Sequence, residues 1–191
     1  MPANPRRERE RAQRHQLIIE AARELAEAEG WDSVTTRRLA ERVEYSQPVL
    51  YSHFDGKDAI VRAVAIRGFE ELADALRRAR LAAVRGPVGP LLAVCQAYID
   101  FAVDSPALYQ AMFVMPTDIR FASDETPPPL RDCFDEFVSA LPAGTADREL
   151  LAEVIWASLH GLVVLAATGR IPPSAQAERI ALLVTRFTGA V

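Results

Sequence analysis

Hydrogen-bonding side chains are concentrated between residues 46 and 57. The amide of Gln47 can pair bidentately with adenine, and Pro48 or Val49 can contact the methyl group of thymine. Side chains that can donate to phosphate oxygens follow closely, namely Tyr51, Ser52, His53 and Lys57. These residue types indicate a surface that contacts both the base edges and the backbone of double-stranded DNA.

Two short helices would have to position these side chains. Thr35 or Thr36 can cap a first helix that ends near Arg42. Residues 43–45 then form a three-residue connection. A helix, a short turn and a second helix make up the helix-turn-helix arrangement, whose second helix enters the major groove of DNA.

The second helix is predicted over residues 47–52. Ser46 can cap it, and Pro48 falls in its first turn, where a missing N–H costs little. The spacing is equally compatible with three short helices that form only a core, with Tyr51 and Phe54 buried.

Apolar residues recur at three- and four-residue steps along most of the chain, which indicates helices. No stretch alternates with a period of two, and no internal repeat is visible. We therefore expect an all-α fold of about nine helices. Besides the two short helices, the pattern predicts helices over 9–29, 57–85, 91–103, 108–115, 130–141, 147–168 and 174–187.

The net charge of −4 alone argues against nucleic-acid binding, so its distribution along the chain matters more. Residues 1–15 carry five arginines against Glu8 and Glu10, whereas residues 58–191 hold the whole acidic excess. The basic N-terminal residues either contact phosphate or the minor groove of DNA, or form a disordered solubilising tail.

The sequence has no glycine-rich phosphate loop, no nucleophile elbow and no supported pair of catalytic carboxylates. His15, His53 and His160 are too scattered for a metal site, and Cys95 and Cys133 lack metal-type spacing. We expect no enzymatic activity, no cofactor and no metal.

The longest apolar stretch, residues 150–167, contains Glu153 and His160, which are costly inside a bilayer. A buried helix is therefore favoured over a membrane span. Residues 1–16 are charged and do not resemble a secretory signal. We expect a cytoplasmic protein that has no membrane partner.

Residues 12–62 resemble the DNA-binding domain of the tetracycline-repressor (TetR) family of bacterial transcription regulators. The ordered segments that carry the resemblance are Ala28–Trp31, Thr35–Val43, Ser46–Phe54 and Gly56–Asp58. Within this likeness, Glu44 occupies the turn position where the family usually has glycine. A glutamate in the left-handed conformation costs about 1 kcal/mol.

The resemblance implies a role for each residue of the motif. Thr35 would cap its helix and touch a phosphate, whereas Tyr51, His53 and Lys57 would hold the DNA backbone. The side chains of residues 47–49 would face the bases. The expected DNA-binding residues are Thr35, Thr36, Arg37, Ser46, Gln47, Pro48, Val49, Tyr51, His53 and Lys57.

The rest of the chain is similar to a C-terminal subtype of the family that is named for a Trp-His-Gly signature. Trp156, His160 and Gly161 match that signature, and residues 105–113 match an earlier segment. The resemblance implies a small-molecule site, and aromatic residues make an apolar or aromatic effector the expectation. His160 can instead be an ordinary core residue. The expected effector pocket consists of Tyr98, Phe101, Met112, Phe113, Trp156 and His160.

The helix predicted over 147–168 is apolar on nearly every face and must be covered on all sides, which a small monomer rarely achieves. The last helix carries a second apolar stripe. Two such helices from each of two subunits form a twofold-symmetric interface, as the resemblance also implies. The alternative is that both helices belong to the core. The expected dimer interface consists of Leu151, Val154, Leu162, Ile180, Leu183, Val184 and Phe187.

These expectations divide the chain into a basic flexible tail (1–11), a helix-turn-helix domain (12–56) and a helical effector-binding and dimerisation domain (57–191). The expected function is that of a repressor, a homodimer that binds a palindromic DNA operator and is released by a small effector. The alternatives are an activator of the same fold, or a helical ligand-binding or interaction protein without specific DNA binding.

Overall fold

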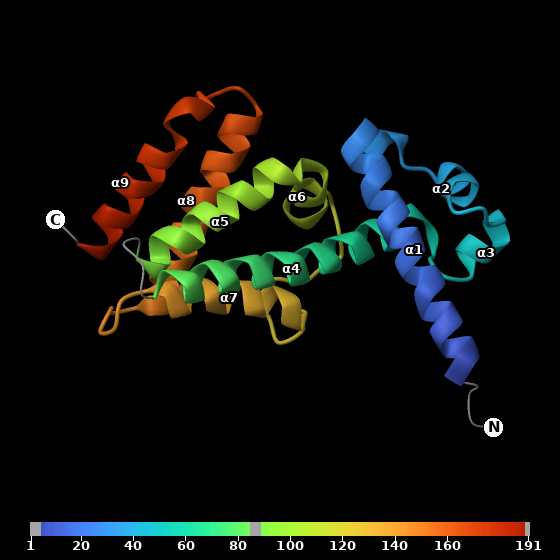
Figure 1. Ribbon diagram of the computed structural model, residues 1–191, viewed down its shortest axis with the longest axis horizontal. Coiled ribbons are helices and arrows are strands. Elements are labelled where there is room, and N and C mark those ends of the chain that lie inside the picture. The colour runs from blue at the N-terminus through green and yellow to red at the C-terminus, as the bar shows by residue number, and fades with distance from the viewer. Residues whose placement is uncertain (1–4, 85–88, 190–191) are drawn as a thin grey trace. The chain divides into compact units, whose positions relative to one another are not determined.

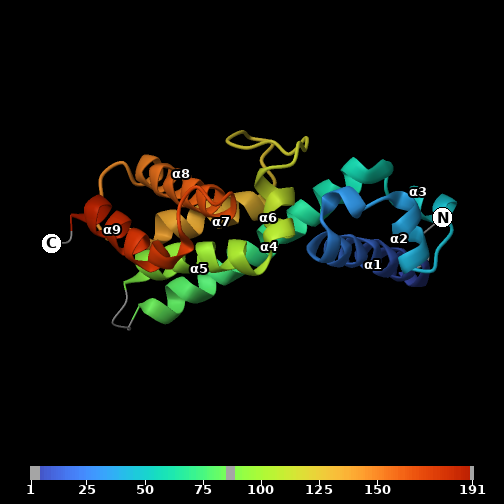
Figure 2. The same cartoon turned by 90° about the horizontal axis from the view of Figure 1, so that it is seen from above.

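The computed structural model describes residues 5–84 and 89–189, and all regular structure in these ranges is helical (Figures 1 and 2). This confirms the predicted all-α class. The predicted tail residues 1–4 and the predicted helix break at 86–88 lie outside the described residues. The helices are α1 (Pro5–Glu29), α2 (Thr36–Arg42), α3 (Gln47–Tyr51), α4 (Gly56–Ala83), α5 (Pro90–Asp104), α6 (Pro106–Phe113), α7 (Pro128–Ala140), α8 (Arg148–Ala167) and α9 (Gln176–Thr188), with short 3₁₀ turns at Trp31–Ser33 and Pro173–Ala175.

The described chain forms two compact units. Unit 1 contains the residues up to Gly68 together with Ser105–Ile119, and unit 2 contains Phe69–Asp104 and the residues from Arg120 onward. Helix α4 therefore contributes its first part to unit 1 and its second part to unit 2. Unit 1 is larger than the helix-turn-helix domain expected from the sequence, because it extends into α4 and includes α6.

Unit 1 is organised around α1, which has 25 residues and begins at Pro5, before the predicted start at Arg9. Ile18, Ala22 and Leu25 form its buried face. Helices α2 and α3 bury Leu39 and Leu50 respectively, and Phe54 follows α3 into the same unit. The short helices are thus held by apolar residues from each element, since helices of this length are marginal by themselves.

The connection between α2 and α3 has the left-handed residue that the resemblance implied. Glu44 has a φ of 56°, in the region that favours glycine. Thr35 caps α2 as predicted, because its Oγ1 accepts a hydrogen bond from the backbone N–H of Arg38 at 3.2 Å. Ser46 occupies the N-cap position of α3, but its side chain makes no capping hydrogen bond, so the predicted Ser46 cap is wrong.

In unit 2, α5 packs against α7, α8 and α9. Glu136 on α7 is buried, and both of its oxygens are bound by arginines of α4. Arg77 Nε donates to Oε1 at 3.0 Å, and Arg80 Nε donates to Oε2 at 2.6 Å. A buried carboxylate is costly unless it is paired in this way, so the cluster ties α7 to the second part of α4.

Helix α8 is only partly covered by its own chain. Ala152, Ile155 and Leu159 are buried, whereas Leu150 and Val154 are 61% and 41% exposed. Its length and composition would also suffice for a membrane span, a test that core helices of soluble proteins pass as well. Packing within this chain therefore does not explain why α8 carries apolar side chains such as Leu150 and Val154.

Replacing the strained turn residue should stabilise unit 1. We expect Glu44→Gly to raise its free energy of unfolding by about 0.5 to 1 kcal/mol, because glycine adopts positive φ without a Cβ penalty. The measurement is urea denaturation followed by Trp31 fluorescence in a Trp156→Phe background, which leaves a single reporter inside unit 1.

Glu41→Gly is the matched control, because it removes the same charge from the last turn of α2, at a residue whose φ is not positive. It should destabilise unit 1 by about 1 kcal/mol. Equal destabilisation by the two substitutions would contradict the assignment of strain to Glu44.

Candidate nucleic-acid interface

The first turn of α3 presents its polar side to solvent. Gln47 and Pro48 are exposed, Val49 is half-buried, and Leu50 is fully buried as the anchor of the helix. Pro48 lies in the first turn of α3, where a backbone N–H has no partner within the helix, so the missing N–H of proline costs little. The structure therefore brings together one amide and two small apolar groups, the set predicted to face base edges.

Tyr51 lies at the end of the same short helix and is 53% exposed. Its hydroxyl is 3.4 Å from the Oγ1 of Thr36 on α2. The sequence-based alternative with both Tyr51 and Phe54 buried is thus wrong for Tyr51, although Phe54 is buried. The two hydroxyls are available as donors to a phosphate oxygen at this edge of α2 and α3.

Lys57, at the start of α4, has a structural role that the sequence did not show. Its Nζ donates a hydrogen bond to the backbone carbonyl of Trp31 at 2.6 Å. This contact joins the beginning of α4 to the turn that follows α1. An ammonium group has three donors, so Lys57 retains capacity for a phosphate while it holds the two segments together.

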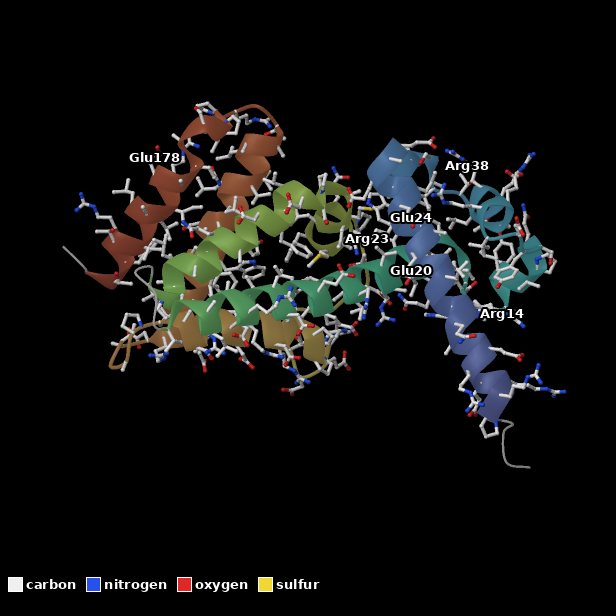
Figure 3. All side chains as sticks on the ribbon, in the orientation of Figure 1. Arg14, Glu20, Arg23, Glu24, Arg38 and Glu178 are labelled. Carbon is white, nitrogen blue, oxygen red and sulfur yellow. The ribbon has the colours of Figure 1, made fainter. Side chains whose placement is uncertain are left out.

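Two ion pairs hold α2 against α1. Arg38 forms a bidentate pair with Glu29, with N···O distances of 2.8 and 2.7 Å, and Arg42 lies 2.8 Å from Glu24. Figure 3 labels one member of each pair, Arg38 on α2 and Glu24 on α1. The hydrogen bond from Arg38 lowers the pKa of Glu29. Arg37, by contrast, is exposed and pairs only along its own helix with Glu41 among the described contacts. Arg37 is therefore the arginine of α2 that is not paired with α1 among the described contacts.

His53 and His15 lie together beside Phe54. The ring of His15 stacks on Phe54 with centroids 4.3 Å apart, and the two imidazoles are 6.4 Å apart. Burial and the nearby Arg11 lower the pKa of both histidines. The Nδ1 of His53 is buried and has no hydrogen-bond partner among the described residues, which also disfavours the charged ring.

In unit 2, the structure joins two of the residues expected to line an effector pocket. Trp156 Nε1 donates to the hydroxyl of Tyr98 at 3.1 Å, with Tyr98 fully buried and Trp156 half-buried. His160 is half-buried, and its burial lowers its pKa. Phe101 is half-buried on α5.

The other two expected pocket residues belong to unit 1. Met112 and Phe113 lie on α6, where Met112 is buried in close contact with Gly68 and Phe113 packs on Tyr109.

The residues expected at the dimer interface differ in exposure. Ile180 is buried within its own chain, so it supports the core of unit 2. Val154 and Phe187 are exposed. The remaining four are half-buried, namely Leu151, Leu162, Leu183 and Val184.

The fold and this surface define an all-α helix-turn-helix regulator. Residues 18–64 match the model of the bacterial regulatory proteins of the tetR family, and residues 91–187 match the tetracyclin repressor-like C-terminal domain. The chain belongs to the TetR family. Members of this family are DNA-binding transcription factors and not enzymes. The finer Trp-His-Gly subtype stays a prediction.

Relatives agree with this assignment, and a solved structure agrees with the fold. The HTH-type transcriptional regulator Rv0681 of Mycobacterium tuberculosis is 31% identical over 80% of this chain and 69% of its own length. YobS of Bacillus subtilis is 32% identical over 54% of this chain, which spans about half (53%) of that relative. The crystal structure of BioQ with its double-stranded DNA operator has the same fold, with a TM-score of 0.65, 22% identity, and coverage of 92% of this chain and 98% of that one.

The three histidines should make the protein less stable in mild acid. The pKa of each is lowered in the folded chain from its usual 6.5, so the unfolded chain takes up protons first as the pH falls. The stability that these histidines give the folded chain is complete above the pKa that they have in the unfolded chain. It is lost as the pH falls below that value. We expect the Tm to fall between about pH 7.5 and pH 5.5.

The measurement is thermal unfolding followed by circular dichroism across this range. The double variant His15→Gln/His53→Gln should show a shallower decline than the unmodified chain. A Tm that rises on acidification would contradict the lowered pKa values.

Proposed function

We propose that the chain represses transcription by binding a palindromic operator as a homodimer, and that a small apolar or aromatic effector releases it. The observation that carries the proposal is the exposed first turn of α3, where Gln47 and Pro48 face solvent while Leu50 anchors the helix. Repression is favoured over activation because occupying a promoter requires no further contact with polymerase. A DNA-binding role places the protein in the cytoplasm.

Double-stranded DNA is the partner that this surface fits. The residues proposed to bind it are those predicted from the sequence, with Gln47 on a base edge and with Tyr51, Thr36 and Arg37 on phosphates. BioQ, which shares the fold, forms a complex with its operator DNA. The basic residues of α1, which are helical from Pro5 and exposed, extend the surface that we propose for the backbone.

A second copy of the chain is the partner that the uncovered apolar side chains of α8 and α9 fit. Leu150, Val154, Leu182 and Phe187 are exposed by between 37% and 61%. Burying such side chains against their symmetry mates stabilises a four-helix interface. A dimer also supplies the two reading helices that a palindromic operator requires.

The effector would bind in unit 2 next to Trp156 and Tyr98. Its binding would favour a dimer whose α3 helices have the wrong separation for DNA, since half-sites lie about 34–36 Å apart or a multiple of this distance. Helix α4, which contributes to both units, would transmit the change. This is a coupling between two binding equilibria.

Selection of bound fragments from random DNA tests the central proposal. The full chain should enrich an inverted repeat, and its affinity should fall steeply with salt because phosphate contacts release counterions. Recovery of no common sequence at low salt would refute operator recognition and favour a ligand-binding or interaction protein without specific DNA binding.

Variants of α3 should separate base from backbone contacts. Gln47→Ala should relax the preference at one position in each half-site, because a bidentate pair contributes about 1–3 kcal/mol of discrimination. Tyr51→Phe removes only a hydroxyl and should weaken binding to all sequences alike. Affinities across a site library provide the measurement, and identical profiles for the two variants would contradict this division of roles.

A charge on α8 should separate the subunits. We expect Val154→Glu to be monomeric by sedimentation and to bind the selected DNA at least tenfold more weakly. Val103→Glu is the matched control, because Val103 is 71% exposed on α5, outside α8 and α9, and this variant should stay dimeric. A dimeric Val154→Glu protein with unchanged DNA affinity would exclude this face as the interface.

A further inference from the structure

Helix α6 follows α5 of unit 2 in the chain, yet it packs within unit 1. The chain passes from unit 2 to unit 1 between Asp104 and Ser105 and returns after Ile119. The segment is therefore joined covalently to unit 2 at both ends. Residues 105–119 are attached to unit 1 only by non-covalent contacts. These contacts show which residue of unit 1 holds α6 in place.

The carboxylate of Glu27 on α1 binds the N-terminus of α6. Its Oε2 accepts a hydrogen bond from the backbone N–H of Ala107 at 3.0 Å, and its Oε1 accepts one from Leu108 at 2.9 Å. The first residue of α6 is Pro106, which has no N–H, and the side chain of Ser105 makes no capping bond. Glu27 thus does from another helix what an N-cap residue does locally.

The charge of Glu27 makes this contact stronger than an ordinary cap. A helix N-terminus carries a partial positive charge that a carboxylate stabilises, and hydrogen bonds to ionised groups are stronger than neutral ones. Because both oxygens bind adjacent amides, the contact also sets the direction in which α6 leaves Ser105.

Three further contacts support this arrangement. The indole Nε1 of Trp31 donates to the carbonyl of Ala107 at 2.7 Å in a buried position. Arg23, which Figure 3 labels, donates to Ser105 Oγ at 3.3 Å. Gly68 on α4 lies so close to α6 that a Cβ there would be 2.6 Å from the sulfur of Met112. Helix α6 therefore has no room to slide past α4 without losing these contacts.

We propose that Glu27 is a positioning residue for the control of DNA binding, because it makes α6 part of the DNA-binding unit. This inference rests on the proposed function. A change in unit 2 that displaces the end of α5 reaches the DNA-binding unit at the bonds between Glu27 and residues 107 and 108. By the reciprocity of coupled equilibria, DNA bound to unit 1 also stabilises α6.

Hydrogen exchange of the full chain tests this inference without an effector. In the unmodified protein, the DNA fragment recovered by random selection should slow the exchange of residues 107–113 at least tenfold. In Glu27→Gln, these amides should exchange at least tenfold faster in the free protein, and the DNA should slow them less than twofold. Helix α7 should be unaffected, and the affinity for DNA should change less than threefold.

Two other variants keep the test decisive. Glu20→Gln removes the same charge from α1 at a residue whose described partner is Gln16 on the same helix, and it should behave as the unmodified protein. Trp31→Phe removes the donor to Ala107 while keeping an aromatic ring, and it should shift exchange in the same direction as Glu27→Gln. It serves in place of Glu27→Gln if that variant does not fold.

The outcomes separate this inference from the proposed function. Unchanged exchange of residues 107–113 in Glu27→Gln, or in Trp31→Phe where Glu27→Gln does not fold, would overturn the role of Glu27. Faster exchange of α6 with full protection by DNA would show a structural cap without coupling and would also overturn it. A protein that binds no DNA would refute the proposed function, and with it the control of DNA binding, while the exchange of the free variants would still decide whether Glu27 holds α6.

Discussion

The surface proposed to face DNA depends on a helix that is too short to be stable by itself. Helix α3 has five residues, and isolated helices of that length do not form in water. Leu50 and Phe54 supply the constraint, because both are buried in the core of unit 1 while Gln47, Pro48 and Tyr51 stay exposed. The position of Gln47 is therefore a consequence of hydrophobic burial one turn away.

Polar contacts then define how the helices of unit 1 are joined. The bidentate Arg38–Glu29 pair connects α2 to the end of α1, Lys57 connects α4 to Trp31, and Glu27 connects α6 to α1. Exposed ion pairs contribute little to stability individually, but each of these has a partner on another element. These contacts specify the relative positions of the helices, which matters for a surface proposed to match the spacing of base edges.

The sequence predicted the elements well and their cross-contacts poorly. The apolar spacing of Ile18, Ala22 and Leu25 is local information, as is the motif around Thr35 and Glu44, and the structure agrees with both. The partners Lys57–Trp31 and Glu27–Ala107 are 26 and 80 residues apart, so no local pattern predicts them. For the same reason, no local pattern predicts that α6 belongs to unit 1.

Binding of a palindromic operator by a homodimer requires two reading helices on one DNA duplex. Hydroxyl-radical footprinting of the full chain on its selected DNA fragment tests this requirement most directly. We expect two patches of protection, related by twofold symmetry and separated by about 34–36 Å or a multiple of this distance. A single protected patch, or even protection along the whole fragment, would contradict this requirement.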